Sequence, residues 1–255
     1  MQALYKFLLL QVLASLGQQA LGSEIIKGKN ANKKSMMYMA SVQNKMGHAC
    51  GGFLISEDYV MTAAHCDDWK PESVVLGTHD LKKVNDATMR YSIQKCKHPS
   101  YKKLGSGSDI MLLKLSRKAL VGKKPIQPVQ LPSGEINPKT YKKCKVAGWG
   151  LTKTGGTAVP KLQVANVPVI DQKTCQKLWK NKLPANVTCA GGYGTKTGFC
   201  QGDSGGPLVC GKDVAVAVAS FNNNKTCTYP NIPNIYTDVS KFLPWINRIL
   251  RKKKC

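Results

Sequence analysis

The chain has 255 residues, enough for one large domain or two smaller ones with a sizeable buried core. It carries 38 Lys and Arg against 14 Asp and Glu, a net charge of +24. Its ten cysteines include no Cys-x-x-Cys pair, which favours disulfides in an oxidising compartment and excludes a zinc site of that spacing.

The N-terminus has the pattern of a secretory signal peptide. A single Lys precedes an apolar run from Phe7 to Leu16, which is too short to span a bilayer. Ala20 and Gly22 follow with the spacing that signal peptidase prefers. We therefore predict a signal peptide over residues 1–22; the alternative is a buried N-terminal helix. No later stretch is long and apolar enough to span a membrane.

Short apolar or alternating runs, separated by loops rich in Gly, Pro, Asn and Lys, predict an all-β body. In chain order the predicted strands are YMASV, GGFLI, YVMTAA, SVVLG, DIMLLKL, KVAGWG, PLVC and VAVAVAS. Regular short strands are typical of barrels or a sandwich. The Pro-containing segment from Gln127 to Cys144 is a candidate connection between two halves.

The tail predicts one helix. Phe242, Trp245, Ile246 and Ile249 fall on one helical face, and the basic end suits a helix C-terminus. Pro244 is compatible with the first turn of that helix.

One stretch indicates nucleophilic chemistry. TGFCQGDSGGPLVC places Asp203 directly before Ser204, with glycines on both sides. A serine hydroxyl needs a base, usually a His held by a carboxylate. His65 ends the apolar run MTAAHC, and Asp109 opens the run DIMLLKL, where a lone carboxylate is costly unless paired. Taken singly, the stretch around Ser204 fits a surface turn, His65 fits a core histidine and Asp109 fits a strand-capping aspartate. Together the three residues favour catalysis.

The motifs MTAAHC, SDIMLLKL, CKVAGWG and GDSGGPLVC occur in this order, and IIKG follows a two-residue segment. From Ile25 to about Leu250 the chain resembles the trypsin/chymotrypsin family of serine proteases. The resemblance implies an all-β fold of two six-stranded antiparallel β-barrels with a C-terminal α-helix, and no cofactor or metal. The implied ranges are an N-terminal barrel over about 25–130, a C-terminal barrel over about 131–240 and a helix over about 241–251.

The resemblance also assigns roles to the candidate residues. His65 would be the general base, Asp109 would orient it, and Ser204 would attack the peptide carbonyl. The backbone N–H groups of Gly202 and Ser204 would form the oxyanion hole. Ser220 matches the family serine that supports the aspartate.

Activation is expected to pair a new amino group at Ile25 with Asp203. The preceding dipeptide, residues 23–24, ends in Glu. It resembles the short segment of granzymes, mast-cell chymases and neutrophil elastase-type proteases, which a dipeptidyl peptidase removes and which are stored in granules. A digestive protease would carry a longer propeptide ending in Lys or Arg. Lys27 departs from the family, which usually has Gly there.

The resemblance implies four disulfides: Cys50–Cys66, Cys144–Cys210, Cys175–Cys189 and Cys200–Cys227. Cys96 and Cys255 are left over, and they could pair, join a dimer or stay free. Asn186 and Asn224 begin glycosylation sequons.

The pocket for the residue before the cut is expected to lie over Gly198, where a trypsin-like member needs Asp. Cleavage after Lys or Arg is therefore not expected. Phe199 should shorten the pocket, while Asn222 and Asn234 should add amides, which suits Met, Leu, Val, Asn or Asp. The alternative is that Phe199 turns aside and the pocket is chymotrypsin-like. Gln201, Ser220 and Phe221 complete the predicted substrate-binding residues.

The charge attracts polyanions, and for a secreted protein these are sulfated proteoglycans or anionic membranes. Nucleic acid is the second candidate for a polyanionic partner, although the sequence has no recognisable nucleic-acid-binding motif. The other interpretation is that the positive charge only aids solubility. The favoured function is a secreted or granule-stored serine endopeptidase acting on proteins and peptides, with serpin-type inhibitors as further partners. The competing function is a non-enzymatic cationic binder of glycosaminoglycans or microbes that has a protease fold.

Overall fold

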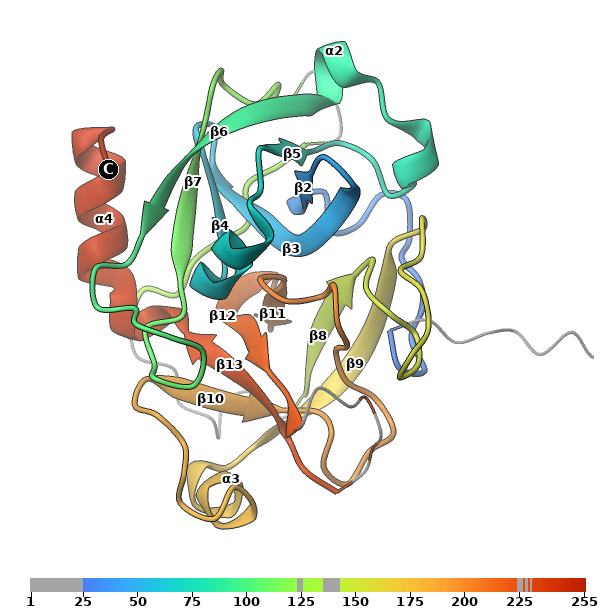
Figure 1. Cartoon of the computed structure of the whole chain (residues 1–255), viewed down its shortest axis with the longest axis vertical. Coiled ribbons are helices and arrows are strands. Elements are labelled where there is room, and N and C mark those ends of the chain that lie inside the picture. The colour runs from blue at the N-terminus through green and yellow to red at the C-terminus, as the bar shows by residue number, and fades with distance from the viewer. Residues whose placement is uncertain (1–24, 123–125, 135–142, 224–226, 228, 230) are drawn as a thin grey trace, which may run out of the picture.

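A computed structural model of the whole chain describes residues 25–122, 126–134, 143–223, 227, 229 and 231–255 (Figure 1). The predicted signal peptide over 1–22, the dipeptide 23–24 and the sequon residue Asn224 lie outside the described residues. In the described part, no helix combines the length and the apolar character that crossing a membrane requires.

The first barrel closes from six antiparallel strands in the order β2-β3-β4-β7-β6-β5. The strands are β2 (Met39–Asn44), β3 (Gly47–Ser56), β4 (Tyr59–Thr62), β5 (Ser73–Val75), β6 (Arg90–Lys97) and β7 (Met111–Leu115). The ring closes where β2 pairs with β5, with Ser41 opposite Val75. Phe53, Leu54 and Val60 are buried within it, as the apolar runs in their strands predict.

The second barrel is also antiparallel and closes where β8 pairs with β9. Its strands are β8 (Lys143–Gly148), β9 (Gln163–Ile170), β10 (Val187–Ala190), β11 (Pro207–Cys210), β12 (Val214–Phe221) and β13 (Asn234–Asp238). The expectation of two six-stranded antiparallel barrels is confirmed. The short strand β1 (Lys29–Asn30), from the predicted N-terminal range, pairs with β9 at the edge of this second barrel.

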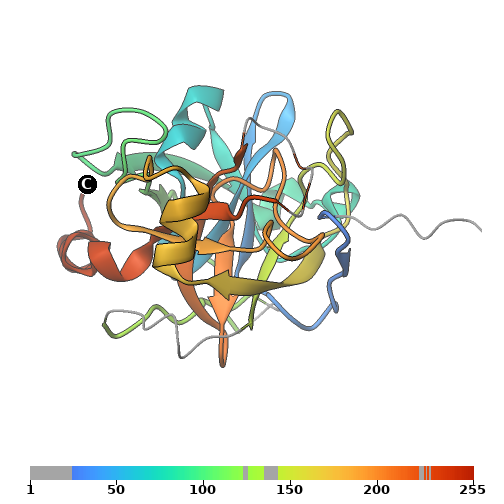
Figure 2. The ribbon, with the colours of Figure 1, turned by 90° about the horizontal axis from the view of Figure 1, so that it is seen from below.

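The predicted tail helix is also confirmed. It is α4 (Leu243–Lys252), with Pro244 in its first turn and the 3-10 turn η4 (Val239–Phe242) before it. Trp245, Ile246 and Ile249 are buried in the large core cluster that contains the apolar residues of the first barrel. Figure 2 shows α4 and β1 on opposite sides of the molecule. The shorter helices are η1 (Ala64–Trp69), η2 (Leu81–Lys83), α2 (Asp86–Met89) and α3 (Gln172–Leu178).

Disulfides join all ten cysteines. The pairs are Cys50–Cys66, Cys96–Cys255, Cys144–Cys210, Cys175–Cys189 and Cys200–Cys227. Cys96 and Cys255 therefore pair with each other. This disulfide joins β6 to the C-terminal residue of the chain, which follows α4 in the sequence. Such a cross-linked fold is typical of oxidising, extracellular-type compartments.

Candidate active site

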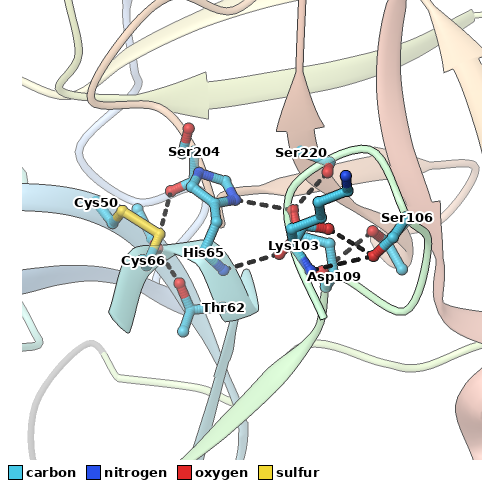
Figure 3. Close-up of polar contacts among 11 residues, drawn as sticks. Cys50, Thr62, His65, Cys66, Lys103, Ser106, Asp109, Ser204 and Ser220 are labelled. Carbon is cyan, nitrogen blue, oxygen red and sulfur yellow. Dashed lines mark hydrogen bonds and ion pairs between the residues drawn. A yellow bond between two sulfur atoms is a disulfide. The ribbon is translucent and has the colours of Figure 1, made fainter. Parts of the chain in front are cut away.

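Two neighbouring strands of the first barrel bring His65 and Asp109 together. Thr62 at the end of β4 lies opposite Met111 at the start of β7, so the residues just beyond these strand ends meet. His65 Nδ1 lies 2.8 Å from Asp109 Oδ2, and the backbone N–H of His65 donates to Asp109 Oδ1 at 2.9 Å (Figure 3). These two contacts fix both the position and the orientation of the imidazole.

Asp109 is almost completely enclosed, with 2 % of its surface exposed. The Ser220 hydroxyl donates to its Oδ2 at 2.5 Å, and the Thr237 hydroxyl donates to its backbone carbonyl at 3.0 Å. Burial raises the pKa of the Asp109 carboxyl, but the hydrogen bonds from His65 and Ser220 outweigh it and hold that pKa below its ordinary value. The carboxyl is therefore an anion at neutral pH, facing His65.

Ser204 lies on the other side of the His65 ring. Figure 3 shows the imidazole between Ser204 and Asp109. Ser204 is partly exposed, and its carbonyl accepts a hydrogen bond at 2.8 Å from the N–H of Gly51 in β3. The serine of the second barrel is thus held beside the His of the first. A His oriented in this way can take a proton from a neighbouring hydroxyl and activate it as a nucleophile.

The glycines around Ser204 meet two separate demands. Gly202 and Gly205 have φ values of +90° and +82°, a region that L side chains rarely adopt. A Cβ at Gly205 would also lie 2.1 Å from the Thr62 hydroxyl oxygen, where the two barrels touch. The turn carrying Ser204 therefore depends on glycine for its backbone angles and for its fit against the first barrel.

His48 is a site residue that the sequence motifs do not identify. Its Nε2 lies 3.0 Å from the Gly202 carbonyl oxygen and its Nδ1 lies 2.8 Å from the Ser41 hydroxyl. Burial lowers the pKa of His48 to about 4, against the effect of the hydrogen bond to Gly202. A neutral ring fits both contacts, with Nε2–H donating to Gly202 and Nδ1 accepting from Ser41. His48 thus anchors the loop that bears Ser204, across 154 residues of sequence.

Asp203 points away from the catalytic cluster into the second barrel. None of its surface is exposed, and its two carboxyl oxygens accept from the N–H groups of Gly150 at 2.8 Å and Cys200 at 2.9 Å. Burial raises the pKa of Asp203 to about 7 despite these two hydrogen bonds. Among the described residues no positive charge contributes to this pKa, so only the two backbone N–H groups oppose the effect of burial.

The start of the described chain lies along the segment that carries Asp203. Ile25 is completely buried in the same core cluster as Phe199, and Ile26 forms an antiparallel bridge with Gly198. Lys27 is exposed and has a φ of 55°, in the region that glycine adopts most easily. The departure at Lys27 therefore puts a non-glycine residue at a position with left-handed backbone angles.

The buried acid predicts a pH-dependent stability in protein that retains the residues before Ile25. Because the folded-state pKa of Asp203 is raised, its contribution is fully present below the unfolded value of 3.8 and is lost as pH rises to about 7. We expect the melting temperature of the wild type, relative to that of Asp203→Asn, to fall across this window. Thermal unfolding of both proteins between pH 4 and 8 measures it; a difference that does not change with pH would contradict the prediction.

The predicted pocket is filled at its base. Gly198 is buried, and a Cβ built on it would lie 2.3 Å from Asn234 Oδ1 and 2.7 Å from the Tyr229 hydroxyl oxygen. Phe199 is 2 % exposed and packs edge-on against Tyr236, 5.2 Å between ring centres. Tyr229 was not predicted. The signal that could have identified it is its place two residues after Cys227, in a loop that the disulfide to Cys200 ties to the pocket.

The remaining predicted pocket residues lie in the two segments that this disulfide joins. Gln201, Phe221 and Asn222 are all half-buried. The Phe221 ring packs edge-on against Trp179 at 5.5 Å, which holds the end of β12 against α3.

Comparison with known proteins agrees with this geometry. The sequence profile of the family described as "Trypsin" matches residues 25–246, which include all the residues of the site. The chain belongs to the trypsin family. Granzyme B(G,H) from Mus musculus is 38% identical over 251 residues, covering 96% of this chain and 99% of that protein.

Two further similar proteins are a duodenase and an elastase. Duodenase-1 from Bos taurus is 36% identical over 251 residues, covering 97% of each chain. Chymotrypsin-like elastase family member 1 from Felis catus is 35% identical over 263 residues, covering 96% of this chain and 98% of that protein. The comparisons therefore establish a serine endopeptidase of the trypsin family without establishing its specificity.

Proposed function

We propose that the protein is a secreted or granule-stored serine endopeptidase that works through an acyl-enzyme. The observation that carries this proposal is the position of His65, which contacts the buried Asp109 through its imidazole and its backbone N–H and lies beside Ser204. The Ser204 hydroxyl attacks the peptide carbonyl carbon while His65 takes its proton. His65 then gives that proton to the leaving amine, and water hydrolyses the ester by the same route.

The negative charge that develops on the carbonyl oxygen needs donors. The N–H groups of Gly202 and Ser204 are the candidates, and loss of one such donor costs roughly 2.7–4 kcal/mol of transition-state stabilisation. The hydrogen bond from His48 to the Gly202 carbonyl supports this role, because it holds the loop in one orientation.

Activation follows from the buried acid. Removal of residues 1–22, and then of the dipeptide 23–24 by a dipeptidyl peptidase, frees the amino group of Ile25. The bridge between Ile26 and Gly198 holds this end of the chain against the segment that carries Asp203. An ammonium group near that carboxyl supplies the missing cation and stabilises the turn that presents Gly202 and Ser204.

The substrate is a protein or peptide cut after a residue other than Lys or Arg. Gly198 is buried under Tyr229 and Asn234, neither of which carries a charge that could pair with a basic side chain. Serpin-type inhibitors, which present a peptide bond to such a site, are the expected protein partners. Asn186 is exposed and is the candidate for glycosylation among the described residues.

Storage with sulfated glycosaminoglycan is supported by a basic groove of about 550 Å³ beside the Cys96–Cys255 disulfide. Trp245, Ile249 and Pro99 line its apolar part. The cations of the groove are Lys95, Lys97, Arg248, Lys252 and Lys254. Asp67 pairs with Lys95 at 2.7 Å and with Lys97 at 2.6 Å, so the groove keeps a net positive charge.

We expect the triple change Arg248→Glu, Lys252→Glu and Lys254→Glu to lower the salt concentration at which the protein elutes from heparin. The matched control changes Lys33, Lys34 and Lys153 to Glu, which alters the net charge equally at other exposed positions. Because screened attraction depends on local charge density, the groove variant should elute well before the control. Equal elution of the two variants would show that overall charge, and not this groove, binds heparin.

A peptide-hydrolysis assay distinguishes the proposed protease from the competing function, a non-enzymatic cationic binder. Protein beginning at Ile25 should cleave members of a peptide library varied at the residue before the cut, and Ser204→Ala should not. Cleavage by both proteins would overturn the assignment of Ser204. Cleavage by neither, with heparin binding intact, would favour the binder.

A further inference from the structure

We propose that Tyr229 closes the base of the specificity pocket, so that this protease cuts after small residues such as Gly, Ala or Ser. The inference rests on the proposed endopeptidase function and narrows its substrate class. This inference replaces the expectation, based on Phe199, Asn222 and Asn234, that the substrate residue before the cut is a medium-sized aliphatic or polar one.

Tyr229 is held by hydrogen bonds to Phe199 and Asn234, which also bond to each other. Its hydroxyl donates to the Phe199 carbonyl at 2.6 Å and accepts from the Asn234 side-chain amide at 2.9 Å. Asn234 in turn accepts from the Phe199 N–H at 3.2 Å through its Oδ1. The phenol therefore satisfies the Phe199 carbonyl and the Asn234 amide, and both residues are buried.

The same phenol occupies the space over the floor of the pocket. A Cβ built on Gly198 would lie 2.6 Å from Tyr229 Cζ, and a Cβ built on Gly192 would lie 3.1 Å from Tyr229 Cε1. The tyrosine ring therefore lies between these two glycines. Since nonbonded carbon atoms stay about 3.5–4.0 Å apart, a long substrate side chain cannot reach Gly198 while Tyr229 is in place.

Two further contacts keep the loop of Tyr229 in this position. The Cys200–Cys227 disulfide anchors it on one side, and Asn231 forms an antiparallel bridge with Tyr193 on the other. Burial raises the pKa of Tyr229 to about 12, against hydrogen bonds from Asn234 and Asn222. The phenol therefore remains a neutral donor to Phe199 throughout the working range of a protease.

The experiment compares kcat/KM for peptides that differ only in the residue before the cut, with Ala, Leu and Phe at that position. The proteins begin at Ile25 and are the wild type, Tyr229→Ala and Tyr229→Phe. Tyr193→Ala is the control at an exposed tyrosine, because the bridge between residue 193 and Asn231 uses backbone atoms and remains possible in that variant. We expect the wild type to prefer Ala over Phe by at least about tenfold, since single methylene groups are worth 10- to 200-fold in such pockets. Tyr229→Ala should reverse this preference, whereas Tyr229→Phe, which keeps the ring, should retain it.

Reaction with a fluorophosphonate separates this inference from the function on which it rests. A wild type that does not react at Ser204 overturns the proposed protease activity. A wild type that reacts but cuts after Phe or Leu as well as after Ala overturns the role of Tyr229. A reactive Tyr229→Ala variant that keeps the preference for Ala would also overturn the role of Tyr229. So would a Tyr229→Phe variant whose kcat/KM for the Phe peptide rises as much as that of Tyr229→Ala.

Discussion

Ser204→Ala is expected to lower kcat/KM for peptide hydrolysis by at least about 10⁴-fold, the scale on which a nucleophile of a catalytic triad contributes. The physical reason is that His65, held by Asp109, then has no hydroxyl to activate. The hydrogen bond that Gly51 makes to residue 204 uses the backbone carbonyl and remains possible in the variant. Steady-state hydrolysis by the Ile25 form measures the effect.

Ser220→Ala is the matched control, because Ser220 also lies in the cluster. Its hydroxyl donates to Asp109 and is almost completely buried, so it cannot reach a substrate carbonyl. Losing one hydrogen bond to a charged group should lower kcat/KM by about 10- to 100-fold. Equal losses in Ser204→Ala and Ser220→Ala would contradict the assignment of Ser204 as the nucleophile.

The second large effect concerns the N-terminus. Protein that retains Ser23 and Glu24 is expected to hydrolyse peptides at least about 10²–10³-fold more slowly than protein that begins at Ile25, the scale of losing an oxyanion donor. Without a free amino group at Ile25, Asp203 stays buried without a cation. The comparison is made before and after treatment of the longer form with a dipeptidyl peptidase.

The variant Asp203→Asn distinguishes the ion pair between Ile25 and Asp203 from other ways in which the dipeptide 23–24 could lower activity. In this variant, removal of the dipeptide should no longer raise activity, because the Ile25 ammonium has no carboxylate to meet. Full activity of the unprocessed wild type, or normal activation of Asp203→Asn, would show that the pair between Ile25 and Asp203 does not control the site.

Strands with an apolar face could be predicted from the sequence, and strands stabilised by distant partners could not. β7 reads as an apolar run because both of its faces are covered. In contrast, β13 is buried throughout although Asn234 and Thr237 are polar, because they bond to Phe199 and Asp109, far away in sequence. Such polar burial is favourable only in the assembled fold, so no local pattern indicates it.

β6 and α3 were missed for a related reason. β6 (Arg90–Lys97) is mostly polar, and only Tyr91 and Cys96 are buried in it. α3 buries only Cys175, although Asp171 caps its first turn by accepting from the N–H of Thr174. A short element with one buried residue carries too weak a periodic signal to be recognised.

At the site, local motifs predicted the residues that we propose to act in catalysis, and tertiary contacts provided those that position them. His65 and Ser204 stand in distinctive strings, and the pairing of β4 with β7 brings His65 to Asp109. His48 and Tyr229 carry no motif. His48 becomes important only because the barrels meet at Gly202, and Tyr229 only because its side chain lies against Gly198.

The most direct test of the account is to map the residue that a fluorophosphonate modifies, by mass spectrometry of digested protein. In the form that begins at Ile25, we predict a single adduct on Ser204, and a much slower reaction in the form that retains Ser23 and Glu24. Only a serine whose hydroxyl is activated by a neighbouring base reacts in this way. An adduct on Ser220 or on any other residue, or no adduct in the Ile25 form, would contradict the central claim that His65 and Asp109 activate Ser204.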